Sequence, residues 1–166
     1  MKKTDNDNAT DFHKLVMEHK STIYSVCYMF AAGKDDADDL FQETLINLWQ
    51  GYRRFRGDSN TRTWVYRVSL NTYISHKRKK QVKTVPLDLS PDILSENNPV
   101  GQQNALLHRR ITQLETFDRA IILLWLEDLP YDEIAAIVGI SAKAVGVRLV
   151  RIRKKLISLN SETITE

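Results

Sequence analysis

The residues best suited to chemistry lie between Tyr52 and Lys80, where nine Lys and Arg residues accompany a single Asp. Trp64 and Asn71 stand two helical turns apart within this segment. Arginines hold phosphates, an aromatic face stacks on a nucleobase, and an amide offers both a donor and an acceptor. Charge of one sign at this density indicates a polyanionic partner, and the aromatic and amide groups favour a nucleic acid.

A basic loop and a helix must position these groups. Gly57 and Asp58 are turn-forming residues, and Ser59 or Asn60 is suited to cap a helix over residues 61–79. Two apolar stripes run along nearly opposite sides of that helix, one with Tyr66, Leu70 and Tyr73 and the other with Trp64, Val68 and Asn71. Either the helix is sandwiched within its own core, or the stripe that contains Trp64 meets a ligand.

An acidic helix precedes the basic loop. It carries Asp35, Asp36, Asp38, Asp39 and Glu43 with no Lys or Arg between them, and its spacing predicts burial of Phe41, Leu45, Leu48 and Tyr52, with Gly51 placed to end it. Acids in a first helical turn suit the helix dipole and need no function. A divalent-metal site at Asp39 and Glu43 is conceivable. No His or second acidic cluster converges on it, so we expect no metal and favour contact with a protein.

The C-terminal part has the pattern of a helix-turn-helix. The stretch LPYDEIAAIVGISAKAVGVRLVRIRKKL predicts a helix over residues 131–138, a left-handed turn at Gly139 and a helix capped by Ser141. The last helix would bury Val145, Leu149, Ile152 and Leu156, and would expose Lys143, Val147, Arg151 and Lys154, with Arg148 and Lys155 on one flank. Its N-terminal end would enter the DNA major groove.

Composition sets the organisation. A hydrophobic fraction of 42% over 166 residues supports packed cores. Residues 84–103 contain three prolines and no Lys or Arg, which indicates a flexible linker. We therefore predict an all-α protein with a helical domain at 1–82, a linker at 83–103 and a helix-turn-helix domain at 104–166. Cys27 is the single cysteine, so an intrachain disulfide is impossible.

The sequence has no apolar run of membrane-spanning length and begins with a polar segment unlike a signal peptide. We expect a cytoplasmic protein with no membrane insertion and no cofactor.

Together these motifs resemble the bacterial sigma factors of the sigma-70 family, in particular the small extracytoplasmic-function (ECF) class. The stretch DDADDLFQETLINLW is similar to the helix that grips the polymerase clamp, which implies polymerase contacts by Asp39, Gln42 and Glu43. The stretch FRGDSNTRTWVYRVSLN is similar to the loop and helix that capture and melt the minus-10 promoter element. The residues so implied are Phe55, Arg56, Gly57, Asp58, Ser59, Asn60, Trp64, Arg67 and Asn71.

The helix-turn-helix resembles the domain that reads the minus-35 element, which implies DNA contacts by Ser141, Lys143, Ala144, Val147, Arg148, Arg151 and Lys154. One departure stands out, since Gly146 and Val147 occupy positions where the family usually has Lys or Arg and then Ser. Val147 can contact a thymine methyl instead. Gly146 weakens the helix by up to about 1 kcal/mol.

The resemblance implies a non-enzymatic factor that joins core RNA polymerase, positions it on promoter DNA and traps unstacked bases until the strands open. It also implies an anti-sigma factor as a partner. Two other functions remain open at this point. A stand-alone helix-turn-helix regulator would need symmetric half-sites, and a metal-dependent nuclease using residues 35–43 would cleave plain DNA with magnesium.

Overall fold

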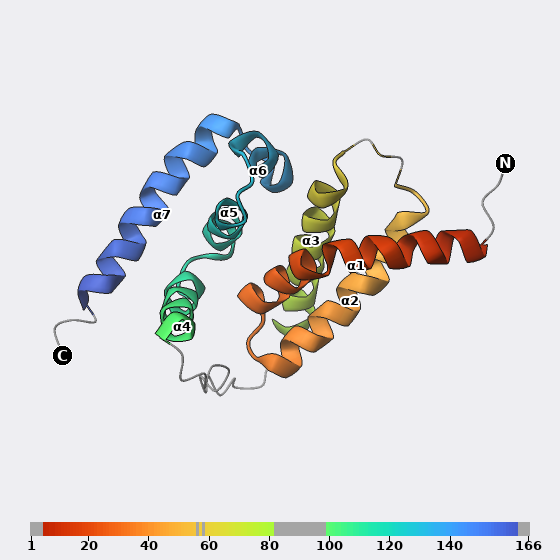
Figure 1. The fold of residues 1–166 in the computed structure, drawn as a ribbon. Coiled ribbons are helices and arrows are strands. Elements are labelled where there is room, and N and C mark those ends of the chain that lie inside the picture. The colour runs from red at the N-terminus through yellow and green to blue at the C-terminus, as the bar shows by residue number, and fades with distance from the viewer. Residues whose placement is uncertain (1–4, 56, 58, 82–98, 163–166) are drawn as a thin grey trace. The chain divides into compact units, whose positions relative to one another are not determined.

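The structure is a computed structural model that describes residues 5–55, 57, 59–81 and 99–162. Within these ranges the chain forms seven helices and no strand, as the all-α prediction expects. It divides into two compact units at residues 90 and 91. The first unit contains α1 (Asp5–Phe30), α2 (Lys34–Tyr52) and α3 (Thr61–Gln81), and the second contains α4 (Pro99–Thr112), α5 (Thr116–Leu126), α6 (Tyr131–Val138) and α7 (Ala142–Glu162) (Figure 1).

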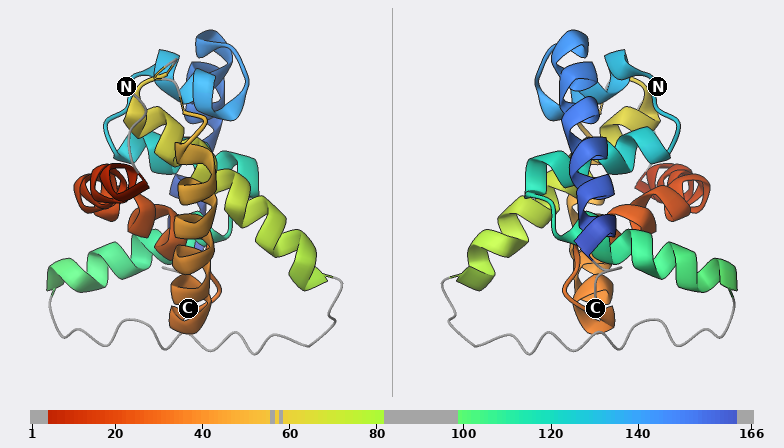
Figure 2. Two further views of the ribbon diagram at one scale, coloured as in Figure 1. Left: turned by 90° about the vertical axis from the view of Figure 1, so that its right-hand side faces the viewer. Right: turned by 90° about the vertical axis from the view of Figure 1, so that its left-hand side faces the viewer.

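In the first unit each of the three helices packs on the other two, and α1 crosses both α2 and α3 (Figures 1 and 2). The core between them is apolar, and its largest fully buried side chains are Ile23, Val26, Leu40, Leu48, Val65 and Tyr66. Leu70 and Tyr73 continue this buried side of α3, which confirms the first predicted stripe. The second stripe stays out of the core, because Trp64 and Val68 are half-buried and Asn71 is exposed.

The buried face of α2 differs from the prediction. Ala37, Leu40, Thr44 and Leu48 are buried, whereas Phe41, Leu45 and Tyr52 are half-buried. Because α2 packs on both α1 and α3, its core-facing side is centred between the two neighbours. The aromatic residues lie at the edge of that side, where Phe41 contacts Tyr24 and Tyr52 contacts Phe12.

In the second unit α5 packs on α4, α6 and α7 (Figure 2). Its apolar segment from Ala120 to Leu124 is buried. Opposite it, α7 buries Val145, Leu149 and Ile152 as its spacing predicts, whereas Leu156, the fourth residue of the predicted stripe, is half-buried. Helix α4 begins at Pro99, within the range expected for the linker, and the linker's residues 83–98 lie outside the described part of the chain.

Three helix ends have the capping residues that the sequence predicts. Asn60 Oδ1 accepts a hydrogen bond from the backbone N–H of Arg62 at 2.9 Å, which caps α3. Ser141 Oγ accepts one from Ala144 at 3.1 Å, which caps α7. Gly139 ends α6 with a φ of 79°, the left-handed conformation that glycine adopts without a steric penalty.

The start of α2 is capped from within its own first turn. Gly33 holds the N-cap position without a side-chain hydrogen bond. Asp36, inside the first turn, accepts the backbone N–H of Ala32 at 2.9 Å. The aspartate therefore reaches back to the preceding loop, in the manner of the acidic partner in a capping box.

Candidate nucleic-acid interface

The polar face of α2 is divided between solvent and the neighbouring helix. Asp39 and Gln42 are exposed. Glu43 is half-buried, and its two carboxylate oxygens lie 2.9 Å from Nδ1 of His76 and 3.0 Å from Nζ of Lys79, both on α3. Sequence reasoning placed all three polar residues together on a free surface, whereas the structure leaves Asp39 and Gln42 there and engages Glu43 within the fold.

His76 is the centre of this cluster and was not identified from the sequence. Its Nε2 lies 3.0 Å from Oδ1 of Asp36, so the imidazole bridges two acids that are seven residues apart on α2. Burial alone would raise the pKa of Glu43, but the hydrogen bonds from His76 and Lys79 outweigh burial and lower that pKa below its ordinary value of 4.5. The sequence does contain a pattern that could have indicated this cluster. His76 and Lys79 are three residues apart on one side of α3, and Asp36 and Glu43 are seven residues apart on one side of α2.

The loop between α2 and α3 is organised by an aromatic stack. The rings of Phe55 and Trp64 lie 4.6 Å apart between centroids, with 24° between their planes. The same indole lies against α2 at Gly51, where an added Cβ would meet the Trp64 ring at 3.2 Å. Gly51 therefore makes room for Trp64 instead of ending α2, which continues to Tyr52.

Other loop residues fit the expected turn. Gly57 has a φ of 76°, in the left-handed region that a turn-forming glycine supplies. Ser59 is half-buried and Asn60 exposed, while Arg56 and Asp58 lie outside the described residues.

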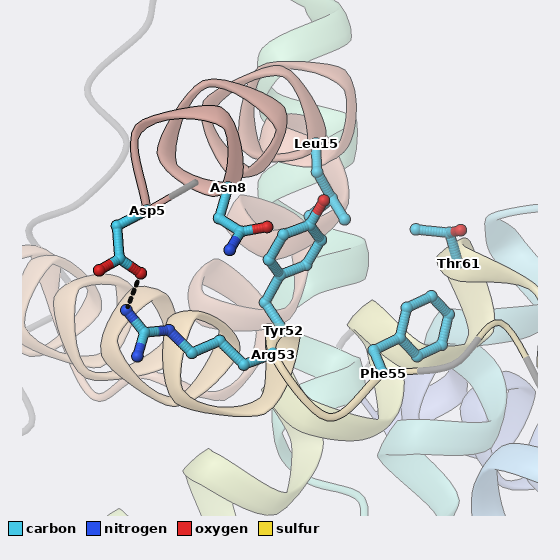
Figure 3. Close-up of a pocket in the computed structure, with 7 residues that line it drawn as sticks. All are labelled: Asp5, Asn8, Leu15, Tyr52, Arg53, Phe55 and Thr61. Carbon is cyan, nitrogen blue, oxygen red and sulfur yellow. Dashed lines mark hydrogen bonds and ion pairs between the residues drawn. The ribbon is translucent and has the colours of Figure 1, made fainter. Parts of the chain in front are cut away.

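A surface pocket joins this loop to the first helix. Figure 3 shows its lining, which consists of Asp5, Asn8, Leu15, Tyr52, Arg53, Phe55 and Thr61. Arg53 Nη2 lies 3.2 Å from Oδ1 of Asp5, and its guanidinium also lies over the ring of Trp49, 5.6 Å from the centroid. The N-terminal turns of α1 thus contribute an acid and an amide to the wall of the basic loop, a contribution that the sequence did not suggest.

Along α3 the remaining candidates, Arg67 and Asn71, are four residues apart and so lie on the same side of the helix. Asn71 is exposed, Arg67 is half-buried, and the cationic end of the helix at Lys77, Arg78 and Lys79 is exposed. The arrangement offers an aromatic stack, an exposed amide and cations within one helix and its preceding loop. These groups can hold an unstacked base and the phosphates beside it.

The exposed face of α7 contains Lys143, Val147, Val150, Arg151 and Lys154. They repeat at three- and four-residue intervals on the side opposite the buried stripe, so they share one face of the helix. Ala144 lies half-buried at the edge of this face. A helix with cations on its outer face, preceded by a short helix and a left-handed turn, fits the major groove of DNA.

Arg148 is engaged within the fold, which changes its expected availability. Its Nη1 lies 2.7 Å from Oδ1 of Asp118, in the first turn of α5, and its guanidinium lies 4.7 Å from the ring centroid of Phe117. Gly146 faces α6, where an added Cβ would stand 3.4 Å from the ring of Tyr131, an ordinary van der Waals contact, so the packing leaves room for a small side chain there. Arg148 ties α7 to α5.

Comparison with known proteins identifies the class. Residues 15–82 match sigma-70 region 2, and residues 104–156 match sigma-70 region 4. The RNA polymerase sigma factor SigV of Bacillus subtilis is 28% identical over 152 residues, which cover 90% of this chain and 92% of SigV. The sigma factor CnrH of Cupriavidus metallidurans is 27% identical over 167 residues, which cover 92% of this chain and 87% of CnrH.

The fold agrees with a solved structure of the same class. Sigma factor RpoE of Bartonella quintana, determined with the anti-sigma factor NepR, superposes with a TM-score of 0.71 over 91% of this chain and 97% of RpoE, at 22% identity. The chain belongs to the sigma-70 family. It is an RNA polymerase sigma factor of the ECF class, and a regulator that acts without polymerase is not favoured.

Two further observations concern the described residues alone. No group of three or more His, Cys, Asp or Glu side chains in this part of the chain is placed to hold a metal ion. No helix in the ranges covered by the structure is both long enough and apolar enough to cross a membrane. Sigma factors are in general DNA-binding initiation factors without enzymatic activity.

Proposed function

We propose that this sigma factor binds core RNA polymerase with the outer face of α2, captures the minus-10 element with the loop before α3 and with α3 itself, and reads the minus-35 element with α7. The observation that carries the proposal is that the two sigma-70 regions each present an exposed polar or basic surface at the stretches that resemble the family's contact segments. The functional domains would be residues 1–82 and 104–166, joined by a linker at 83–103.

The polymerase contact is assigned to Asp39, Gln42 and Glu43. Asp39 and Gln42 are exposed and have no place in the core, so a partner can reach them. Glu43 contributes mainly by joining α2 to α3 through His76 and Lys79, which holds the contact helix in position. The carboxylate and amide groups suit a basic or amide-rich surface on the polymerase.

The minus-10 contact is assigned to Phe55, Arg56, Gly57, Asp58, Ser59, Asn60, Trp64, Arg67 and Asn71. Promoter bases cannot be read inside the stack, so at least one must be held outside it, at a cost of a few kcal/mol. The Phe55 and Trp64 rings supply stacking surface, worth about 1 to 3 kcal/mol for each base. Exposed Asn71 supplies a donor and an acceptor for a base edge.

The minus-35 contact is assigned to Ser141, Lys143, Ala144, Val147, Arg148, Arg151 and Lys154. Lys143 lies in the first turn of α7 and is placed to reach bases, while Arg151 and Lys154 lie further along the exposed face and hold phosphates. Arg148 acts chiefly by fixing α7 on α5, because its guanidinium is paired with Asp118 and lies over Phe117.

The remaining assignments follow from the class. The factor would act in the cytoplasm, without catalysis and without a cofactor, on polymerase and promoter DNA. An anti-sigma factor is a further partner, since RpoE was solved with NepR and CnrH was solved with the cytosolic domain of CnrY.

The test is reconstitution. Purified protein is mixed with core polymerase and genomic fragments, and transcript starts are mapped. We expect new starts that depend on the protein and share upstream sequences. In parallel, the Asp39→Ala/Gln42→Ala double variant should lose co-purification with core polymerase at an unchanged melting temperature, because both residues are exposed. Polymerase binding by the double variant at the wild-type level would contradict the α2 assignment, and absence of any dependent transcript would contradict the proposed function.

A further inference from the structure

The centre of the exposed face of α7 is apolar. Val147 is 48% exposed and Val150 is 52% exposed, whereas Val145, Leu149 and Ile152 on the opposite side are 0 to 2% exposed. Val147 and Val150 therefore contribute little to the core. Exposed valines do not favour the helix either, since a β-branched residue loses side-chain freedom there relative to alanine. Packing and helix propensity leave both residues without a structural explanation.

The polar side chain nearest to these valines is already engaged. From Ala144 to Val150 the one polar side chain in the sequence is that of Arg148, and it is paired with Asp118 at 2.7 Å. Gly146 has no side chain and lies against Tyr131. The centre of this stretch therefore presents methyl groups, with Arg148 held by Asp118 on one flank, while Lys143, Arg151 and Lys154 supply cations at its two ends.

Among the groups that base pairs present in the major groove, the apolar one is the 5-methyl of thymine. Residues three apart on a helix are separated by about 4.5 Å along its axis, close to the roughly 3.4 Å spacing of successive base pairs. Val147 and Val150 can thus reach methyl groups on neighbouring base pairs. The flanking cations suit the phosphates on either side of such a step.

We propose that Val147 and Val150 together form a thymine-methyl contact, so that α7 selects its upstream element partly by two neighbouring thymines and not by hydrogen bonds along the middle of the helix. This inference rests on the proposed function, in which α7 lies in the major groove of the minus-35 element. Val150 is the residue that the family resemblance does not assign. Its place beside Val147 on the exposed face carries the proposal.

The experiment uses the full chain bound to core polymerase and a promoter fragment identified by transcript mapping. Thymines of the minus-35 element are replaced one at a time, and then in pairs, by deoxyuridine, which lacks the methyl group and keeps every hydrogen-bonding atom. Burial of one methyl group is worth a factor of about three to four in affinity. We expect a loss of that size at each of two neighbouring positions and a loss of about tenfold for the pair. Deoxyuridine outside the element is the matched DNA control.

The protein variants make the test specific. Val147→Ala and Val150→Ala should each bind the thymine promoter more weakly and should each become insensitive to deoxyuridine at one of the two positions. Val147→Thr keeps a γ-methyl and should retain part of the sensitivity. Both side chains are exposed, so the melting temperature should stay within a few degrees of the wild type.

Three results would overturn the inference. Promoter binding that is indifferent to deoxyuridine would show that no methyl is read, although the proposed function would stand. Equal sensitivity in wild type and variants would place the methyl contact elsewhere. Loss of core polymerase binding by Val147→Ala or Val150→Ala, with no effect of deoxyuridine, would make this face a protein contact. A chain that directs no transcription with core polymerase would remove the proposed function itself.

Discussion

Replacement of Trp64 and of Asn71 by alanine should separate a base-reading role from a structural role. Trp64 is half-buried, stacked on Phe55 and packed at Gly51. A buried Trp→Ala change costs about 3 to 5 kcal/mol, so the half-buried indole should cost roughly 2 kcal/mol. For a domain of about 60 to 100 residues this corresponds to a melting temperature lower by roughly 8 to 16 °C. Asn71 is exposed, and its replacement should change stability by less than about 0.5 kcal/mol.

The assay measures promoter opening at a temperature where both variants are folded. A fluorescent base analogue in the minus-10 element reports unstacking, and binding to a closed promoter is measured in parallel. Loss of stacking on Trp64 removes about 1 to 3 kcal/mol from the open state, which lowers the open-to-closed ratio by roughly fivefold to 150-fold. Trp64→Phe keeps an aromatic face and should retain most of the opening. Closed-complex binding should be retained by all three variants.

The outcome for Asn71 decides the interpretation. We expect Asn71→Ala to melt normally, because the side chain is exposed, and to open the promoter poorly, because the proposed function assigns its amide to a base. Normal opening by both alanine variants would refute the assignment of this surface to strand opening. A melting temperature for Asn71→Ala as low as that of Trp64→Ala would show that the amide has a structural role.

Four further predictions concern single side chains. Arg151→Ala should lower the slope of log affinity against log salt by about 0.9, the effect of one phosphate contact. Arg148→Ala should leave the salt slope nearly unchanged and should instead lower the melting temperature by roughly 4 to 8 °C. The reason is that its partly exposed ion pair with Asp118 and its contact with the Phe117 ring are together worth about 1 kcal/mol. The pKa of Glu43 is lower in the folded than in the unfolded state, so the ionised carboxylate stabilises the fold above pH 4.5. This stabilisation is lost as the pH falls through the pKa of the folded state. The difference in unfolding free energy between wild type and Glu43→Gln, measured by denaturant titration, should therefore shrink below pH 4.5. Burial raises the pKa of Cys27 to about 11, so a thiol reagent at neutral pH should react slowly with the folded protein and rapidly after denaturation.

Periodicity and capping residues were sufficient to predict most of the fold. The caps at Asn60 and Ser141, the left-handed Gly139 and the buried stripe of α7 are local features, and a single helix determines each of them. The buried side of α2 was predicted only in part, because it depends on two neighbours. Helix α2 packs on both α1 and α3, so the side it buries lies between these two neighbours. The rotation of α2 about its own axis depends on how they pack, and the spacing of apolar residues along α2 does not determine it.

The site was less predictable because its details are contacts between helices. Gly51 has the sequence character of a helix terminator, yet it also gives the Trp64 ring space, since an added Cβ would make a tight 3.2 Å contact with that ring. His76 shows no metal-ligand spacing, and its function in bridging Asp36 and Glu43 exists only once α2 and α3 are side by side. Arg148 matches the family's pattern for DNA contact but lies within reach of Asp118. In each case the contact partner lies on another helix, so the spacing within one helix does not show it.

These contacts also change how the basic charge should be counted. Sequence composition treats every cation between Tyr52 and Lys80 as available to nucleic acid, but Arg53 is paired with Asp5 and Lys79 with Glu43. Exposed pairs of this kind are worth about 0.2 to 1 kcal/mol, so a phosphate that approaches either cation competes with a weak internal partner. The acids therefore leave the surface basic, but they reduce the binding free energy of a polyanion that contacts only these cations. In the proposed function, a promoter strand held at the same time by the aromatic stack would displace these acids, which would favour specific capture over adhesion to DNA of any sequence.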